Sequence, residues 1–434
     1  MHVFISVGEP SGDLHASKLI AELRRHRPEL HVSGFGGPLM ERQGFENLFR
    51  LTDLAVMGIL LVLPLLGKFL RLLWQARCYL RTERPDVVVL VDCPGFNWWV
   101  ARFARGAGIP VVYYLPPQLW AWGSWRIRRV RKYVDRILAC LPFEFDWYRA
   151  RGVNATYVGH PFFDEVASRK LDGEFLSRFG CVEDRESRID DRTVRIRNRK
   201  SEIQNPPVVA ILPGSRNAEL ELNFDLQLEV VARLHAQTPG LRFLVACYKD
   251  SQQQTCETHW RSFEERKWPQ AATSGALHCP SSTGHRPPNI EFHVGKTSEI
   301  IEVADVCLMV SGSVSLEVLA RGTPAVVQFH VSRVDRLIGR LVLTCDYISL
   351  PNLIAGREIL PEFLISGDVE PALQEITTTL HGWLVDPQAR GKKVTELNAL
   401  RRQVCVAGAT ERAAEAVLEY LPSGAGRSPA ARAA

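Results

Sequence analysis

The feature that most constrains the fold of this chain is an alternation of short apolar runs with helical segments, which occurs twice. The first series has apolar runs at 2–7, 87–91, 111–114 and 137–140, and the second follows Pro206-Pro207, with runs at 208–212, 241–246, 306–310 and 325–329. Such alternation is typical of βαβ units in a parallel sheet. The sequence therefore predicts an α/β protein with two Rossmann-like halves, in line with 434 residues at about 150 residues per domain.

Two polar stretches and a biased tail divide the chain further. The segment 183–202 has six acidic and seven basic residues, and the segment 250–288 is rich in Gln, Ser, Thr and Pro. We interpret the first as a solvated insertion or linker and the second as another interruption. The expected organisation is a first domain at 1–180, a linker at 181–205, a second domain at 206–385, helices at 386–422 and a disordered tail at 423–434. A return of the helices at 386–422 to the N-terminal domain is left open.

Positive charge is concentrated beside the most apolar part of the chain. The net charge is only +5, but residues 68–84 carry five basic and one acidic side chain, and residues 126–136 carry six and one. The neighbouring apolar run at 55–66 is shorter than the roughly 20 residues that span a bilayer. Positive charge next to such a run indicates an anionic membrane surface as a partner.

The segment after this run has the pattern of a helix that lies in a membrane interface. Lys68 and Arg71 lie on one face, and apolar side chains repeat at helical spacing on another, at Leu66, Phe69, Leu70, Leu73 and Trp74. This pattern favours a membrane-docking helix. The alternative is a helix that faces the core of a globular domain.

The aromatic residues and cysteines narrow the choice of partners. Six of the ten tryptophans lie within 98–147, close to the basic residues at 126–132. They could bind nucleic acid or form an aromatic belt at a membrane, and the nearby apolar run favours lipid over nucleic acid. The ten cysteines form no Cys-X-X-Cys pair, so we expect buried thiols in a reducing cytoplasm and no metal site. The N-terminus enters a strand directly, which does not fit a signal peptide.

The first strand is followed by a loop that could bind an anion. The loop Gly8-Glu9-Pro10-Ser11-Gly12-Asp13 leaves a strand and opens a helix, so its glycines and the helix N-terminus suit an anionic ligand. It matches neither a dinucleotide fingerprint nor a P-loop. Glu9 stands where open α/β folds place ligands, whereas Asp13 could belong to the site or cap the helix.

Two further strand ends in the first half carry polar side chains. Asp92 ends the apolar strand at 87–91, where a carboxylate is costly unless it is used or paired. It is therefore a candidate general base. His160, in Gly159-His160-Pro161, also stands at a strand end, and both a structural role and a place in the site remain open for it.

The second half has two comparable loops. Gly214, Ser215 and Arg216 follow a strand, and the planar guanidinium of Arg216 suits phosphate oxygens. This favours pyrophosphate binding over a merely structural turn. Ser311, Gly312 and Ser313 follow another strand, and Glu317 comes one turn later, where it could hold ribose hydroxyls or form a capping box. The chain contains no Asp-X-Asp pair, so a leaving diphosphate would depend on Arg216 and helix N-termini.

Taken in order along the chain, the stretches that contain these residues are similar to one family. They are VGEPSGD (7–13), LAVMGI (54–59), LVDCPGFN (90–97), LWAW (119–122), LPFE (141–144), VGHP (158–161), LPGSR (212–216), SGSVSLE (311–317) and DYISLPNLIAGRE (346–358). Through them the chain resembles the lipid-A-disaccharide synthases, which are GT-B glycosyltransferases with two Rossmann-like domains facing a central cleft.

The resemblance implies a reaction and a set of roles. The enzyme would join UDP-2,3-diacylglucosamine to 2,3-diacylglucosamine 1-phosphate (lipid X), with inversion and without a cofactor, to give the disaccharide 1-phosphate and UDP. Asp92 matches the family's critical aspartate and Glu9 its loop glutamate. Arg216, Ser311, Glu317 and Asn352 match positions of the UDP-sugar site. In the acceptor half, Ser11, Asp13 and His160 are further candidates.

The resemblance also implies a location. The family works at the cytoplasmic face of the inner membrane and attaches peripherally through an apolar, basic patch, which residues 55–84 match. Homodimers are familiar in the family.

The chain departs from the family pattern at two positions, and two other functions stay open. Gly95 stands where many members have a second aspartate, and Pro10 replaces a small or hydroxyl residue of the first loop. The segments 183–205 and 250–288 match nothing that we can place in the family. The alternatives are an enzyme like UDP-N-acetylglucosamine 2-epimerase and a degenerate, membrane-bound scaffold.

Overall fold

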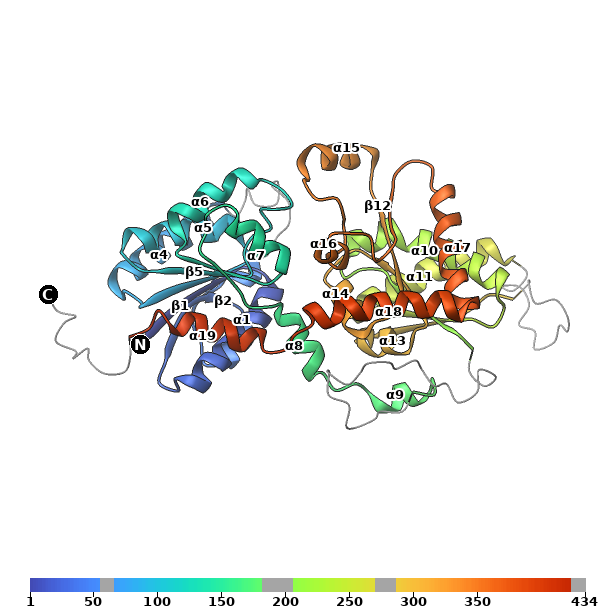
Figure 1. Cartoon of the computed structure of the whole chain (residues 1–434), viewed down its shortest axis with the longest axis horizontal. Coiled ribbons are helices and arrows are strands. Elements are labelled where there is room, and N and C mark those ends of the chain that lie inside the picture. The colour runs from blue at the N-terminus through green and yellow to red at the C-terminus, as the bar shows by residue number, and fades with distance from the viewer. Residues whose placement is uncertain (55–65, 182–205, 270–285, 423–434) are drawn as a thin grey trace. The chain divides into compact units, whose positions relative to one another are not determined.

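The computed structural model describes residues 1–54, 66–181, 206–269 and 286–422. The apolar run at 55–65, nearly all of the expected linker, the stretch 270–285 and the tail at 423–434 lie outside the described residues. By its internal contacts the chain divides into two units (Figure 1), which are Met1–Asp164 with Val406–Ala434, and Glu165–Cys405. Residues 165–180, expected in the first domain, therefore pack in the second unit.

Unit 1 is built on a seven-stranded parallel sheet of order β3-β2-β1-β4-β5-β6-β7. Its strands are β1 (His2–Val7), β2 (His31–Gly36), β3 (Glu46–Arg50), β4 (Val87–Val91), β5 (Val111–Tyr114), β6 (Arg136–Ala139) and β7 (Ala155–Tyr157). Its helices are α1 (Pro10–His26), α2 (Pro38–Arg42), α4 (Leu66–Thr82), α5 (Pro94–Gly106), α6 (Ile127–Tyr133), α7 (Pro142–Arg149), α8 (Pro161–Ser168, across the unit boundary) and α19 (Ala409–Leu418).

Alternation along the strands places one apolar core on each face of this sheet. Val87, Val89 and Val91 of β4 pack with α1 and α19, whereas Val88 and Leu90 pack with α4 and α5. Figure 1 shows α4, α5 and α6 on one face of the sheet and α1 with α19 on the other. A strand buried on both faces reads as a continuous apolar run, which explains why β4 was readable from sequence.

Unit 2 is built on a six-stranded parallel sheet of order β10-β9-β8-β11-β12-β13. Its strands are β8 (Val208–Leu212), β9 (Arg242–Cys247), β10 (Asn289–Val294), β11 (Val306–Val310), β12 (Ala325–His330) and β13 (Glu362–Ile365). Its helices are α9 (Gly173–Ser177), α10 (Asn217–Gln237), α11 (Asp250–Lys267), α13 (Thr297–Val303), α14 (Val314–Arg321), α15 (Arg333–Val342), α16 (Leu350–Ala355), α17 (Glu370–Val385) and α18 (Pro387–Val404). The prediction of an α/β chain with two parallel sheets is confirmed.

The polar stretch that begins at residue 250 differs from its interpretation as an interruption, because its first part is the helix α11. Cys256, Trp260 and Phe263 lie about one turn apart and are buried in the core of unit 2. Three apolar residues at this spacing are enough to dock a helix whose other positions are polar.

The strand orders locate the candidate sites. Each order reverses direction between two neighbouring central strands, β1 and β4 in unit 1 and β8 and β11 in unit 2. In open α/β sheets, ligands bind outside the carboxyl ends of the strands at such a switch point. The loops that carry Glu9, Asp92, Arg216 and Ser311 follow these four strands, whereas His160 follows the edge strand β7.

The C-terminal helices are shared between the units. Helix α18 packs in unit 2, and α19 packs in unit 1. Asp164 accepts hydrogen bonds from the backbone N–H groups of Gly408 (2.7 Å) and Thr410 (2.8 Å), and so caps the N-terminus of α19.

Candidate functional site

The carboxyl end of β4 is a tight turn that is held from several sides. Asp92 and Cys93 follow the strand with φ of 45° and 39°, a left-handed conformation that non-glycine residues rarely adopt. Asn97 donates through Nδ2 to the carbonyl oxygens of Ser6 (3.2 Å), Val91 (3.0 Å) and Asp92 (3.0 Å). These bonds fasten β1 to β4 and fix the position of Asp92.

Asp92 is half-buried in this turn, and one oxygen of its carboxylate is unused. Oδ1 accepts a long hydrogen bond of 3.4 Å from the N–H of Gly8. Oδ2 is buried and has no hydrogen-bond partner among the described residues. Burial, with the negative charge of Glu9 as a second cause, raises the pKa of Asp92 well above its ordinary value. A buried carboxyl group with a raised pKa and an unpaired oxygen is suited to take a proton from a substrate.

Glycines of the first loop make room for this carboxylate. A Cβ on Gly12 would lie 1.9 Å from Oδ2 of Asp92, and a Cβ on Gly8 would lie 2.3 Å from Sγ of Cys93. Both contacts are too short for any side chain, so glycine is required for the N-terminus of α1 to approach Asp92. The sequence reasoning missed Cys93, whose thiol pKa is raised to about 12 by burial and then by the charge of Asp92. It is therefore a thiol and not a nucleophile.

The three residues of this loop that were predicted to belong to the site differ from one another in exposure and contacts. Glu9 is exposed and precedes α1 in an extended conformation, without capping the helix through its side chain. Ser11 is exposed in the first turn of α1. Asp13 is buried and accepts hydrogen bonds of 3.0 Å from the N–H groups of Leu39 and Met40. Asp13 thus caps α2 and not its own helix.

His160 is held at the start of α8. Its Nδ1 accepts a hydrogen bond of 3.2 Å from the N–H of Phe162, and its ring lies edge-on to His15. Burial, followed by the charge of His15, lowers the pKa of His160 to about 3. The ring is neutral at physiological pH, and the bond to Phe162 gives it a structural role at this helix end.

Another buried carboxyl group in unit 1, Glu144, was not singled out in the sequence. Glu144 accepts hydrogen bonds of 3.2 Å from Nε1 of Trp120 and from the N–H of Cys140. Burial raises its pKa to about 7. The acid in LPFE, in the first turn of the helix that follows β6, was a readable signal. Its partner Trp120 lies 24 residues earlier, which no local pattern reveals.

In unit 2, the loop after β8 presents an arginine at a helix N-terminus. Gly214 has φ of +98°, and its carbonyl accepts a hydrogen bond of 2.8 Å from Nε2 of Gln252 on α11. Ser215 and Arg216 are exposed. The Arg216 guanidinium is paired with Glu219 at 2.8 Å and remains 62% exposed, so it stays accessible to a ligand. Gln252 was missed because it lies in the stretch interpreted as an interruption.

The loop after β11 is held through one serine. Ser311 donates its hydroxyl hydrogen to the carbonyl of Ile348 at 2.7 Å, while Gly312 and Ser313 are exposed at the start of α14. Serines and a glycine before a helix present backbone N–H groups, which favour an anion such as a phosphate.

Glu317 is buried in a charged network and not in a capping box of α14. Its Oε1 accepts hydrogen bonds from the hydroxyl of Ser298 (2.5 Å) and from Nε (3.1 Å) and Nη2 (2.9 Å) of Arg321. Arg321 also pairs with Glu302 at 2.8 Å. The donors of Ser298 and Arg321 all meet Oε1, and none of these bonds engages Oε2.

Asn352 is fully used inside the protein. Its Oδ1 accepts hydrogen bonds of 2.8 Å from the N–H groups of Ile359 and Leu360. Its Nδ2 donates at 2.7 Å to the carbonyl of Leu360 and to Glu362, whose carboxylate also accepts from the N–H groups of Ile348 and Ser349. Asn352 therefore positions the segment that Ser311 contacts, and has no capacity left for a ligand.

The amphipathic helix α4 has two apolar sides that its pattern did not separate. Phe69 and Leu73, expected to face a membrane, are half-buried against the core of unit 1. Leu70 and Trp74 are 58% and 68% exposed, and Lys68 and Arg71 are exposed beside them. The side chain of Leu66 lies outside the described atoms. The core-facing interpretation holds for one side of the helix, and the membrane-docking interpretation of its exposed side stays a prediction. In the described segments, no helix is both long and apolar enough to cross a membrane.

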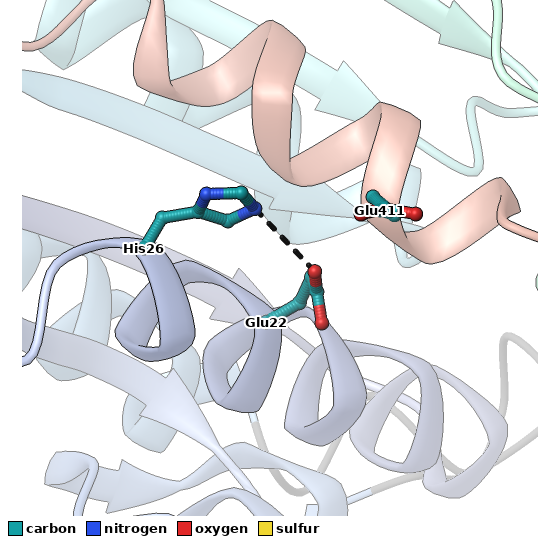
Figure 2. A group of neighbouring side chains, drawn as sticks. All are labelled: Glu22, His26 and Glu411. Atoms are coloured by element: carbon teal, nitrogen blue, oxygen red, sulfur yellow. Dashed lines mark ion pairs between the residues drawn. The ribbon is translucent and has the colours of Figure 1, made fainter.

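Figure 2 shows a cluster on unit 1 that could be mistaken for a metal site. Glu22 and His26 of α1 and Glu411 of α19 have potential ligand atoms within 4.8 Å of one another. His26 lies 3.5 Å from Glu22, and Nη2 of Arg25 lies 2.6 Å from Glu22 and 2.7 Å from Glu411. Because Arg25 supplies the positive charge, we interpret the cluster as an ion-pair link between α1 and α19.

Comparison with protein families places the chain among known sequences. A family model described as lipid-A-disaccharide synthetase matches residues 3–267 and 285–411. The lipid-A-disaccharide synthase of Myxococcus xanthus is 33% identical over 422 residues, which cover 97% of this chain and 98% of the relative. That of Syntrophus aciditrophicus is 32% identical over 419 residues, which cover 96% and 97%.

Solved structures show the same fold at low identity. A Staphylococcus aureus MnaA–UDP co-structure has a TM-score of 0.59 at 11% identity, covering 96% of both chains. The glycotransferase of kitacinnamycin has a TM-score of 0.54 at 17% identity, covering 97% of this chain and 99% of its own. Acinetobacter baumannii MurG has a TM-score of 0.53 at 12% identity, covering 96% and 99%. These likenesses show the fold alone, and the predicted GT-B class, two parallel sheets with alternating helices, is confirmed.

Proposed function

This chain belongs to the lipid-A-disaccharide synthase family of glycosyltransferases, and from that premise we propose its substrates and the roles of its residues. The donor would be UDP-2,3-diacylglucosamine, and the acceptor would be 2,3-diacylglucosamine 1-phosphate. The products would be the β-1′,6-linked disaccharide 1-phosphate and UDP. The observation that carries this proposal is the buried Oδ2 of Asp92, which no described residue contacts through a hydrogen bond.

Asp92 would act as the general base on the acceptor. Its ionised carboxylate takes the proton of the acceptor's 6-hydroxyl while that oxygen attacks the anomeric carbon of the donor. A single displacement of this kind inverts the anomeric carbon and forms no covalent enzyme intermediate. The exposed carboxylate of Glu9 raises the pKa of Asp92 through its charge, which strengthens the base near neutral pH.

Unit 2 would bind the UDP portion of the donor. Arg216 can pair with the diphosphate once it releases Glu219, and the N-terminus of α14 offers backbone N–H groups to the same charge. As the glycosidic bond forms, these groups stabilise the negative charge that develops on the leaving UDP. The remaining oxygen of Glu317 would accept from a ribose hydroxyl, and Asn352 would position the loop. The reaction transfers a sugar and needs no redox cofactor.

Acylated substrates would require the enzyme to work at a membrane surface. The exposed side of α4, with Leu70 and Trp74 beside Lys68 and Arg71, fits the interface of an anionic bilayer. We place the enzyme peripherally at the cytoplasmic face of the inner membrane, and homodimers are part of the same proposal.

The test is an assay with both lipid substrates in detergent, in which disaccharide is followed by mass and UDP by its release. We expect one UDP for each disaccharide. UDP-N-acetylmannosamine formed from UDP-N-acetylglucosamine, without disaccharide, would favour a 2-epimerase. Neither product would favour a catalytically inactive scaffold and would contradict the proposal.

A further inference from the structure

Helix α15 in unit 2 exposes an apolar face to solvent. No residue of this helix is buried. Its large apolar side chains repeat at i, i+3, i+4, i+7 and i+8 and are between 46% and 80% exposed, at Val334, Leu337, Ile338, Leu341 and Val342. With Leu343 (47%), they are six of the ten exposed large apolar side chains described in unit 2. A patch of this kind marks an interaction surface rather than the scattered exposure that every protein has.

The polar side of α15 is anchored to unit 2. Ser332 caps the helix by accepting a hydrogen bond of 3.0 Å from the N–H of Asp335. Arg336 donates to Ser366 at 2.9 Å, and a Cβ on Gly367 would lie 3.2 Å from the Arg333 guanidinium. Both contacts are made with the segment that follows β13. The helix therefore rests on its arginine side, while its apolar side chains stay in solvent, and Figure 1 shows it projecting from the rest of unit 2.

The charge of α15 is mainly positive and is not neutralised by neighbours. It carries Arg333, Arg336 and Arg340 and one acidic residue, Asp335, whose carboxylate accepts from Ser332 at 2.8 Å. Within the described residues, no carboxylate forms an ion pair with any of these arginines. An apolar stripe flanked by arginines complements an anionic bilayer surface, where the stripe enters the acyl boundary and the arginines meet phosphates. A ten-residue helix is about 15 Å long, so it can lie in this interface without spanning it.

The position of α15 in the chain links it to the proposed donor site. It follows β12 at the carboxyl edge of the sheet of unit 2, the edge that carries the loops of Arg216 and Ser311. The chain then returns to Ile348, whose carbonyl accepts from Ser311. A donor that carries acyl chains would have to reach this edge from a lipid phase. This argument for a lipid contact at α15 rests on the proposed function.

We propose that α15 is a second membrane-docking element, which inserts its apolar face into the interface of an anionic bilayer independently of α4. A second copy of the chain fits this face less well, because two faces flanked by arginines repel each other. A stable interface also needs about 800 Å² from each partner, more than one side of a ten-residue helix offers.

The test is flotation of the full-length chain with phosphatidylcholine vesicles that contain or lack phosphatidylglycerol. We compare the wild type with Leu337→Glu plus Leu341→Glu, two exposed positions whose substitution leaves every described hydrogen bond in place. Leu222→Glu is the matched control, because Leu222 is an exposed leucine (52%) on α10 of the same unit. Sedimentation velocity without lipid reports oligomeric state, and sugar transfer in detergent reports the proposed function without a bilayer.

We expect the double variant to bind anionic vesicles at least about tenfold more weakly than the wild type does. Leu222→Glu should bind as the wild type does, and the double variant should retain transfer in detergent. Equal vesicle binding by the double variant and the wild type would overturn the proposal. An equal loss of vesicle binding in Leu222→Glu would also overturn it, and so would wild-type binding that does not depend on phosphatidylglycerol. A double variant that differs from the wild type only in being a monomer where the wild type is a dimer would overturn it as well. Loss of transfer in detergent with intact vesicle binding would also overturn it, because the face would then hold substrate. Absence of transfer in the wild type would contradict the proposed function alone.

Discussion

The two units use polar side chains near their candidate sites in opposite ways. In unit 1, Oδ2 of Asp92 is buried without a hydrogen-bond partner among the described residues, and the pKa of Asp92 is raised. In unit 2, Asn352 uses every donor and acceptor of its side chain, and three donors converge on one oxygen of Glu317. An unpaired buried carboxylate is expensive and is retained where chemistry needs it, whereas a saturated network contributes rigidity. The proposed function accordingly gives proton transfer to unit 1 and ligand positioning to unit 2.

The largest effect expected from this comparison follows Asp92→Asn. The amide keeps the shape but cannot take a proton, so kcat should fall about 10³-fold.

The same variant should change how stability depends on pH. The folded-state pKa of Asp92 is raised, so ionisation destabilises the wild type as pH rises through the ordinary carboxyl range toward that raised pKa. The amide of the variant cannot ionise, and the variant should therefore gain stability relative to the wild type at higher pH and not below the ordinary range of a carboxyl group. Disaccharide assays and thermal unfolding at two pH values measure both effects, and full activity in the variant would contradict the assignment.

A smaller loss is expected from Gly12→Ala. The new Cβ would stand 1.9 Å from Oδ2 of Asp92, so either the carboxylate or the start of α1 must move. A displacement of this size at a reacting group lowers kcat about 100-fold. Gly106→Ala, at a helical glycine with open space around its Cβ position, is the control and should keep wild-type activity. Equal activity of both variants would show that Asp92 tolerates displacement.

In unit 2 the comparison predicts a loss of stability. Asn352→Ala leaves two backbone N–H groups without their acceptor and should destabilise unit 2 by about 2–3 kcal/mol. Asn398→Ala is the control, because Oδ1 of Asn398 has no hydrogen-bond partner among the described residues, and it should change stability by less than about 1 kcal/mol. Calorimetry, which can resolve the two units, measures the change. If both variants lost equally little stability, the Asn352 network would not stabilise unit 2.

The smallest effect is expected from Arg216→Ala. The guanidinium is exposed and pairs only with Glu219 among the described residues, so its removal should leave stability almost unchanged. The KM for the UDP-sugar should rise about tenfold, with a smaller change in kcat. Steady-state kinetics with varied donor test this, and an unchanged KM would remove Arg216 from the proposed nucleotide site.

Local patterns were sufficient for the strands at the two switch points and for the loops that follow them. The runs at 2–7, 87–91, 111–114, 208–212 and 306–310 are strands with the predicted bounds, because strands buried on both faces are continuously apolar. The order of these strands then brings Glu9 and Asp92 to one switch point. The strand β2, HVSGFG, was missed because its Ser33 and Gly34 break the apolar pattern.

The roles of individual polar residues depended on distant partners and were less predictable. Asp13 accepts from the N–H of Leu39, 26 residues later, and Glu317 meets Ser298 of another helix. Asn352 was expected to contact the nucleotide, but its partners come from the turn before β13 and from β13 itself. Sequence spacing identifies which residues are polar at a strand end, but not which of them the fold has already satisfied.

The two amphipathic helices show the same limit. The pattern of α4 was readable, yet Phe69 and Leu73 pack inward while Leu70 and Trp74 do not. The apolar spacing in α15 is equally regular and would suit a core helix. Only the fold shows that nothing described in unit 2 covers it.

The claim that Asp92 is the proton acceptor is tested most directly by the pH dependence of kcat/KM. An ionised Asp92 is required, so the rate should fall as pH decreases through its raised pKa, above the ordinary range of about 4. Burial is the main cause of this raised pKa, and the charge of Glu9 adds to it, so Glu9→Gln should shift the acid limb to lower pH. An acid limb in the ordinary carboxyl range, or one that does not move in Glu9→Gln, would contradict the account.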